Sequence, residues 1–279
     1  GFGANAGLNA LLIYGLGLGL PGSALGTVIA QWLMALWLVG IVVSRARPHQ
    51  VSLFPGQAGV LRAARLGGWL FVRTISLRVA FVGATVVATQ LGTTELATWH
   101  VAFTVFTLGA LALDSLEIAA QTLVGHRLGA SDSTGTRHVV RRVTRWGVVA
   151  GVVIGLALAV LTPLLTVVVT SDPGVRALLP LTLWTLALAL PLGGYVFVLD
   201  GVLMGAGDGR YLALTGIANL AAVLPLFWLT LWAAQESTLA WIGIVTLQAS
   251  VGFGYLGARA LTLGLRARGT RWMVLGVDY

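Results

Sequence analysis

Eight apolar stretches, each about as long as one helix needs to cross a bilayer, follow one another along this sequence. Their approximate ranges are 5–20, 24–43, 68–91, 96–124, 147–169, 177–204, 211–234 and 239–263. Apolar side chains surround each stretch, and in lipid every backbone N–H and C=O must be bonded inside its own segment. The sequence therefore predicts an all-α fold, a polytopic helical membrane protein with about eight transmembrane helices.

The composition excludes several functional classes. Only 9% of the residues are charged and there is no cysteine, so neither a soluble enzyme domain nor a thiolate metal site is expected. All 17 basic residues are arginine and lie in short clusters between apolar stretches, which argues against nucleic acid as a partner. The one G-x-G-x-x-G pattern, Gly17 to Gly22, follows no strand. We expect no enzyme, no cofactor and no bound metal, and the lipid bilayer as the chief partner.

Arginine placement predicts the orientation, because cytoplasmic loops of membrane proteins carry an excess of basic residues. If the chain enters from the cytoplasm, the outer loops contain only Arg176. The inner loops then contain Arg45, Arg47, Arg62, Arg65, Arg127, Arg137, Arg141, Arg142, Arg145, Arg210, Arg259, Arg266, Arg268 and Arg271. This distribution predicts a multi-pass membrane protein with a cytoplasmic C-terminus, and the expected location is the plasma membrane.

An internal echo predicts a repeat. Asn9 and Gln31 lie on the first predicted helix pair as Asn219 and Gln248 lie on the last, and transporters are commonly built from such repeats. The chain begins with Gly1, and on this register one repeat is shortened by about four helices.

The segment Ser44–Gly67 interrupts this series of helices. Its Pro48, Pro55 and Gly56 break an amphipathic pattern, so we expect it to lie along the membrane surface between two halves.

Local patterns within the later stretches predict packing and capping. Gly147, Gly151 and Gly155 recur every four residues, a spacing that lets another helix approach closely. Asp132 precedes a helix and is a candidate for its N-cap.

Acidic residues inside the apolar stretches are the main candidates for function, since an ionised group near the bilayer centre costs at least about 2.5–3.5 kcal/mol. Asp114 and Glu117 are three residues apart, so they share a helix face with Gln121. Asp200 follows Pro191 and two glycines, which are expected to loosen its helix. The three carboxyls are expected to line one inner cavity.

Structural ion pairs are the alternative interpretation of these acids. The possible partners are Arg73 and Arg78 on the third helix. Because Arg78 lies deeper than Arg73, we predict that Arg78 is paired with an acid instead of extending to the surface.

Three strings are similar to a known family. The run NAGLNALLIYGLGLGLPGSALGTVIAQ (5–31) resembles the fifth and sixth helices of multidrug and toxic compound extrusion (MATE) transporters, in the branch named for DinF. The strings ALDSLEIAAQTLVGHRLGA (112–130) and YVFVLDGVLMGAGDGRYLA (195–213) resemble the eighth and tenth helices of that family.

The resemblance implies an incomplete two-lobe transporter fold with pseudo-twofold repeats. Residues 1–43 would be the last two helices of the first lobe, 44–67 the cytoplasmic linker, 68–266 the second lobe and 267–279 a cytoplasmic tail. It also implies proton- or sodium-coupled export of small amphipathic or cationic compounds, by a protein that is monomeric at full length.

The resemblance also implies the course of the substrate and ion pathway. The family's positions match Asn5, Asn9, Thr27 and Asp200. Helix spacing and the internal echo add Asp114, Glu117, Gln121 and Gln31 to this predicted pathway. Some members have an aspartate at the position of Asn9, which as an amide cannot titrate. Other branches carry a glutamate near Arg73, where this sequence has none.

Two further functions stay open at this point. A flippase of lipid-linked precursors would use Arg73 and Arg78 to bind a pyrophosphate. A structural membrane fragment without transport activity is the other alternative.

Overall fold

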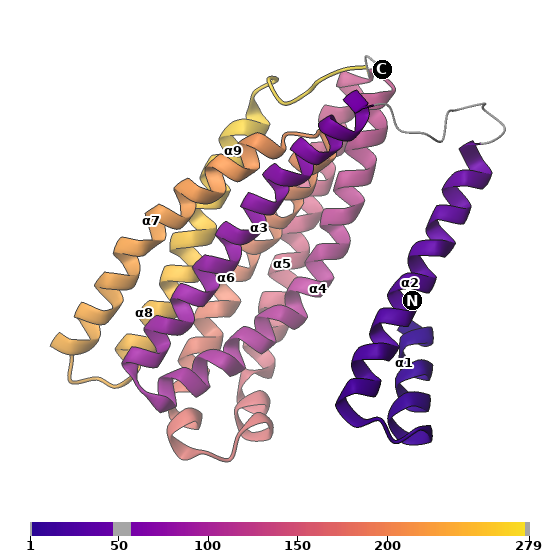
Figure 1. Cartoon of the computed structure of the whole chain (residues 1–279). Helices are drawn as coiled ribbons and strands as arrows, with labels where there is room; N and C mark the ends of the chain where they lie inside the picture. Colours follow the sequence, from indigo (N-terminus) through magenta and orange to yellow (C-terminus); the bar gives the residue numbers. More distant parts are fainter. Residues whose placement is uncertain (1, 47–56, 277–279) are drawn as a thin grey trace. The chain divides into compact units, whose positions relative to one another are not determined.

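The computed structural model describes residues 2–46 and 57–276, and all regular secondary structure in these two ranges is helical (Figure 1). The chain divides into two compact units, Gly1–Arg62 and Ala63–Tyr279, with the division inside the predicted linker. Within the described residues, seven helices are long and apolar enough to cross a membrane. The protein is thus a helical, multi-pass membrane protein.

The first unit contains a short helix followed by a long one. Helix α1 (Phe2–Ala10) continues into the π-helical turn η1 (Leu11–Gly15), and α2 (Gly19–Ala46) follows. The expected span 5–20 ends early, so this segment is not among the seven long helices. Gly17 and Gly19 have φ angles of 64° and 55°, a left-handed conformation that glycine adopts readily and that ends a helix. Hydropathy alone does not register this break.

Helices joined by short turns make up the second unit, and the first of them begins a few residues before it. They are α3 (Gln57–Leu91), α4 (Thr93–Gly129), α5 (Ser133–Val169), α6 (Pro173–Gly205), α7 (Gly209–Glu236), α8 (Trp241–Ala249) and α9 (Leu256–Arg268). The π-helical turn η3 (Ser250–Tyr255) joins α8 and α9 into one span.

The predicted surface segment between the halves is only partly described. Pro48, Pro55 and Gly56, on which that prediction depended, lie outside the described residues. Residues 57–67 belong to the start of α3 and so continue directly into a spanning helix.

Glycines bring α5 into backbone contact with α6, as their four-residue spacing predicts. A Cβ atom at Gly147 would lie 2.5 Å from the carbonyl oxygen of Gly194, and one at Gly155 would lie 2.5 Å from that of Ala187. Gly151 is packed in the same way against the carbonyl of Leu190. Helix α6 is α-helical from Pro173 to Gly205, and of the two glycines expected to loosen it, Gly194 packs against the backbone of Gly147.

A second pair of glycines brings α6 against α4. Cβ atoms at Gly201 and Gly205 would collide with the backbone carbonyl oxygens of Glu117 and Gln121. The close approach of these two backbones places Asp200, on α6, beside Glu117 on α4.

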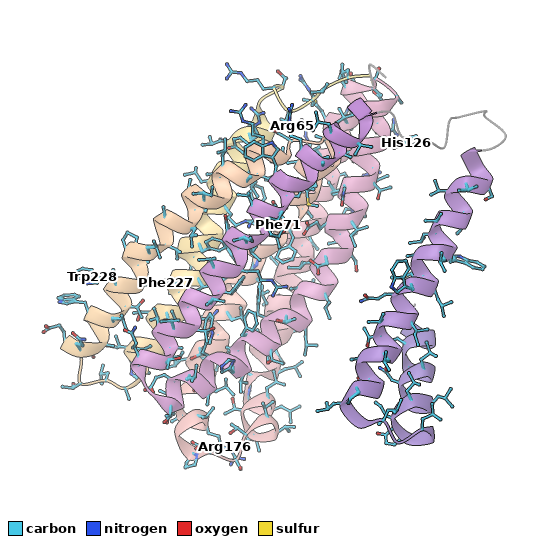
Figure 2. The ribbon with its side chains drawn as sticks, viewed as in Figure 1. Arg65, Phe71, His126, Arg176, Phe227 and Trp228 are labelled. Carbon is cyan, nitrogen blue, oxygen red and sulfur yellow. The ribbon has the colours of Figure 1, made fainter. Side chains whose placement is uncertain are left out.

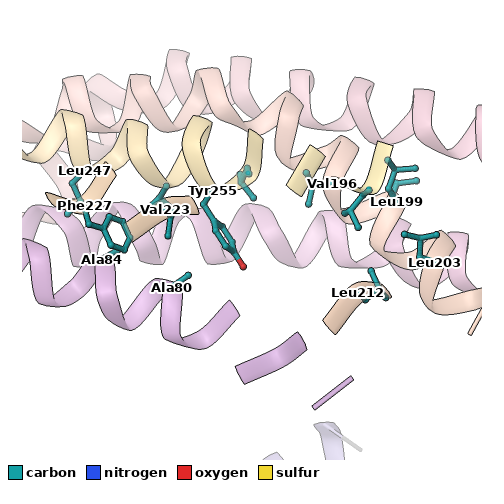
Figure 3. Packing of buried hydrophobic residues seen from close by; sticks show 14 of the residues in the cluster. Ala80, Ala84, Val196, Leu199, Leu203, Leu212, Val223, Phe227, Leu247 and Tyr255 are labelled. Atoms are coloured by element: carbon teal, nitrogen blue, oxygen red, sulfur yellow. The ribbon is translucent and has the colours of Figure 1, made fainter. Parts of the chain in front are cut away.

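The apolar core of the second unit gathers around α6. Figure 3 shows Val196, Leu199 and Leu203 of α6 on the side of Leu212 of α7, and Ala80 and Ala84 of α3 on the side of Val223 and Phe227 of α7. These residues are buried, and their side chains contain no polar atoms. The polar side chains of α6 that lie nearest to them are therefore surrounded by apolar side chains.

The two ends of the second unit differ in charge. Figure 2 shows Arg65 and His126 at one end and Arg176 at the opposite end. The C-terminal segment returns to the first of these ends, where the backbone N–H of Gly276 donates to the carbonyl oxygen of Leu128 at 3.3 Å. The arginine-rich turns and the tail therefore lie on the same side of this unit.

Asp132 caps α5, as its position predicts. Its Oδ1 accepts from the backbone N–H of Gly135 at 2.7 Å, and its Oδ2 accepts from Nη1 of Arg127 at 2.7 Å. The backbone hydrogen bond, followed by the bond from Arg127, lowers the pKa of Asp132 below its ordinary value.

Candidate functional site

A buried ion-pair network joins three helices of the second unit. Asp200 on α6 accepts from Nη2 of Arg73 on α3 at 2.7 Å, and its same oxygen, Oδ2, accepts from Nη2 of Arg259 on α9. The side chains of Asp200 and Arg259 are only 5% and 4% exposed. Each charge is buried where it needs a partner, so the network fixes the relative positions of α3, α6 and α9.

Glu117 extends this network onto α4. Its Oε1 lies 3.6 Å from Nη2 of Arg73, and the two side chains are 16% and 15% exposed. One guanidinium group thus lies between two carboxylates, with Asp200 at the shorter distance. The positive charge of Arg73 therefore interacts with a carboxylate on each helix, more closely with Asp200 on α6 than with Glu117 on α4.

The hydrogen bonding of the network is incomplete. Asp200 Oδ1 and the Nε atoms of Arg73 and Arg259 are buried without a hydrogen-bond partner among the described residues. Buried polar groups are normally bonded, so after a small rearrangement Oδ1 of Asp200 could accept a further hydrogen bond and the two Nε–H groups could each donate one.

A cavity of about 320 Å³ opens beside the network. Asp114 and Glu117 line it on the acidic side, and Arg73, Arg78 and Arg259 line it on the basic side. Asp200 is not among the residues that line the cavity, but it contacts Arg73 and Arg259, which do line it. The structure therefore places two of the three predicted carboxyls in one cavity and connects the third to it through arginine.

Aromatic side chains form another wall of this cavity. The ring of Phe81 lies 5.2 Å from that of Phe103 and 5.9 Å from that of Phe106, measured between centroids. Tyr255, the last residue of η3, also lines the cavity, and its hydroxyl oxygen accepts from Nη1 of Arg259 at 3.4 Å. A π-helical turn adds a residue to the helix, so η3 rotates the side chains that follow it relative to those of α8.

The ion pairs differ from the sequence interpretation at two arginines. Arg78, which was predicted to pair with an acid, is exposed and has no carboxylate within 4 Å among the described residues. Arg259, assigned from the sequence to an inner loop, is the buried partner instead. Its position four residues after Tyr255 and inside the stretch 239–263 was the signal for an inward-facing side chain.

The polar residues predicted for the pathway belong partly to the first unit and partly to the second. In the first unit, Nδ2 of Asn9 donates to Oδ1 of Asn5 at 2.7 Å, while Thr27 bonds to the backbone of its own helix. Gln31 is exposed on α2. In the second unit, Gln121 is half-buried, and it is the carbonyl of its backbone that packs against Gly205.

The site at Asp200 does not fit a bare metal cation. Oδ2 of Asp200 already accepts from two guanidinium groups, and these groups would repel a further positive charge at either carboxylate oxygen. Arg73 is also engaged by Asp200, which removes one of the two arginines that a pyrophosphate-binding flippase would use.

A family profile, MatE, matches residues 70–229 of this sequence. The chain is 30% identical over 224 residues to Protein DETOXIFICATION 43 of Arabidopsis thaliana, covering 78% of this chain and 42% of that protein. It is 28% identical over 264 residues to DNA damage-inducible protein F of Escherichia coli K12, covering 85% of this chain and 54% of the relative. The chain thus spans about half the length of the curated relatives it matches.

Solved structures show the same fold. The Vibrio cholerae MATE transporter VcmN in its bent form superimposes with a TM-score of 0.79 at 20% identity, over 95% of this chain and 60% of that one. The likeness covers both described units and supports the helical transporter fold.

Proposed function

We propose that this chain, which belongs to the MatE family of multidrug and toxin extrusion transporters, forms part of a secondary active antiporter. The whole protein would export small amphipathic or cationic compounds from the cytoplasm across the plasma membrane, with its C-terminus in the cytoplasm. Members of this family are transporters and not enzymes, and they need no cofactor. We also propose that the coupling ion is a proton or sodium and that the full-length protein is monomeric.

The observation that supports coupling most directly is the position of Arg73 between two carboxylates, at 2.7 Å from Asp200 and 3.6 Å from Glu117. A transporter needs two states that differ in their affinity for the coupling ion. A change of charge on Glu117 would alter its hold on Arg73, and Arg73 in turn contacts α6 through Asp200. The packing of α3, α4 and α6 would then respond to the charge of one side chain.

The cavity beside the network suits an amphipathic cation. Carboxylates of Asp114 and Glu117 offer counter-charges, and the rings of Phe81, Phe103 and Phe106 offer a surface for apolar or cation–π contact. Substrate and coupling ion would thus compete for the same acidic side of the cavity.

The arrangement of carboxylates in the second unit supports protons as the coupling ions. Asp200 is already neutralised by two guanidinium groups, so we assign proton exchange to Glu117 and Asp114, and to Asp200 the task of holding the arginines. We also propose that five further side chains provide polar contacts for substrate or ion along the pathway: Asn5, Asn9, Thr27, Gln31 and Gln121.

The test is efflux of a fluorescent cationic dye by the full-length protein in membrane vesicles. Glu117→Gln keeps the shape of the side chain but cannot exchange a proton, so we expect at least a tenfold loss of pH-gradient-driven efflux. Glu236→Gln, at the exposed end of α7, is the matched control and should retain efflux.

Two results would contradict the proposal. Undiminished efflux by Glu117→Gln at matched expression would exclude this carboxyl from coupling. Efflux that requires a sodium gradient and ignores the pH gradient would assign coupling to Na⁺ instead.

A further inference from the structure

One face of α5 carries the densest positive charge among the described residues of the protein. Arg137, Arg141 and Arg145 follow one another at intervals of four residues, with His138 and Arg142 beside them, and all five side chains are exposed. We call these five residues the α5 basic face. Residues four apart point the same way on a helix, so the guanidinium groups lie in one row.

The charges of the α5 basic face are not compensated within the described protein. None of its four arginines has a carboxylate within 4 Å among the described residues. Asp132, the nearest acid in the sequence, already accepts from Arg127 and from the backbone of Gly135. Like charges four residues apart on a helix repel one another. An anion from outside the chain would therefore stabilise this face.

The surface at this face is hollowed, with a polar part and an apolar part. One hollow of about 360 Å³ is lined by Ser133, Thr134, Arg137, His138 and Arg141. A second hollow of about 470 Å³ is lined by His138, Arg141, Arg142, Arg145, Trp146 and Val149. The two share His138 and Arg141, so they adjoin each other. Along α5 the lining changes from hydroxyl and guanidinium groups to an indole ring and aliphatic side chains.

The apolar part continues into the membrane-spanning stretch. Val149, Val153 and Leu156 are exposed on α5, at 50%, 59% and 63%. A soluble anion would use only the guanidinium groups, whereas a phospholipid has a phosphate for the arginines and an acyl chain for the surface below them. Trp146, at the junction, belongs to the residue type that is enriched where membrane meets water.

We propose that the α5 basic face and the adjoining Trp146 and Val149 bind an anionic phospholipid. Guanidinium groups of Arg141 and Arg145 contact the phosphate, because the planar guanidinium donates two parallel hydrogen bonds to it. The acyl chain lies along the exposed aliphatic residues of α5. A general preference for arginine on the cytoplasmic side explains positive charge there, but not a row of three arginines, with a fourth beside it, along hollows bordered by tryptophan.

The binding test uses the purified full-length protein in detergent with added phosphatidylglycerol or phosphatidylcholine. Thermal unfolding and native mass spectrometry report stabilisation and the number of bound lipids. We expect phosphatidylglycerol to raise the Tm by several degrees more than phosphatidylcholine. The double variant Arg141→Gln, Arg145→Gln should lose at least tenfold in affinity for phosphatidylglycerol.

The matched control is Arg268→Gln, Arg271→Gln, which removes the same charge from exposed arginines at the C-terminal end. It should bind phosphatidylglycerol like the unmodified protein. If the first double variant is not monodisperse, the single variants Arg141→Gln and Arg145→Gln serve the same comparison.

Two outcomes would overturn this inference. Equal loss of lipid in both double variants would show that only overall positive charge attracts the headgroup. Stabilisation by inorganic phosphate or glycerol phosphate equal to that by phosphatidylglycerol would make the site one for a soluble anion.

Discussion

Asp200 accepts from two arginines through one oxygen, and this single contact determines what its replacement will do. The side chains of Asp200 and Arg259 are almost fully buried, so neither charge can be solvated by water if its partner is removed. Arg73 could turn toward Glu117, but Arg259 has no second carboxylate within 4 Å among the described residues. The two arginines therefore depend on Asp200 to different degrees.

The first prediction concerns the stability of this network. Asp200→Asn should destabilise the protein by about 3–5 kcal/mol, because it leaves a buried guanidinium without a counter-charge. Adding Arg259→Met should restore a large part of that loss, while adding Arg73→Met should restore less. Chemical unfolding in detergent measures all of these variants.

The control for this prediction is Asp208→Asn. Asp208 accepts from Arg266 at 2.7 Å, but their side chains are more exposed, at 14% and 23%, so its loss should matter less. If Asp200→Asn were as stable as Asp208→Asn, the buried network would not hold the helices together.

At the scale of the helices, α6 is positioned by glycine on two sides. Gly147, Gly151 and Gly155 of α5 meet one side of it, and its own Gly201 and Gly205 meet α4 on another. Side chains larger than hydrogen would push these backbones apart. The site therefore depends on residues that carry no functional group, since they set the distance between the helices that bear Asp200 and Glu117.

A substitution in this contact tests its importance. Gly147→Ala should destabilise the protein by about 1–3 kcal/mol, because its Cβ would lie 2.5 Å from the backbone carbonyl oxygen of Gly194, which cannot rotate away. Gly257→Ala, in α9, meets no atom within 4 Å and serves as the control. It should be neutral or slightly stabilising, since alanine is the better helix former. Equal unfolding midpoints for the two variants would refute close packing at Gly147.

At the scale of the whole molecule, the second unit places its arginine-rich turns and its C-terminal segment at one end. The orientation of that end toward the cytoplasm is a prediction from the charge distribution. The chain has no cysteine, so labels can be introduced one at a time.

Labelling with an impermeant thiol reagent in intact cells tests the orientation. Cysteines at Ser131 or Thr134 should be protected, and cysteines at Ser171 or Ser237 should react. The two pairs are each other's control, because each lies in or beside a turn between long helices. The reverse pattern would place the C-terminus outside the cell.

The local sequence was sufficient to predict the helical membrane fold, the close approach of another helix to the glycines of α5, and the N-cap of α5 at Asp132. Each depends on interactions within one segment or on a short spacing: lipid forces a long apolar segment to satisfy its own backbone, and glycine spacing defines a smooth helix face. The same reasoning misjudged the first helix, where the conformation of Gly17 and Gly19, and not hydropathy, sets the end.

Only the tertiary structure decided which charges meet. Asp200 is 127 residues from Arg73 and 59 from Arg259, and no periodicity relates segments so far apart. The partner of a buried acid depends on the rotation and depth of each helix, which are set by packing against its neighbours. For this reason the sequence identified Asp200 and Glu117 as candidates and named Arg73 and Arg78 as possible partners, but it could not choose between them. The folded protein brings Arg73, together with Arg259, to Asp200.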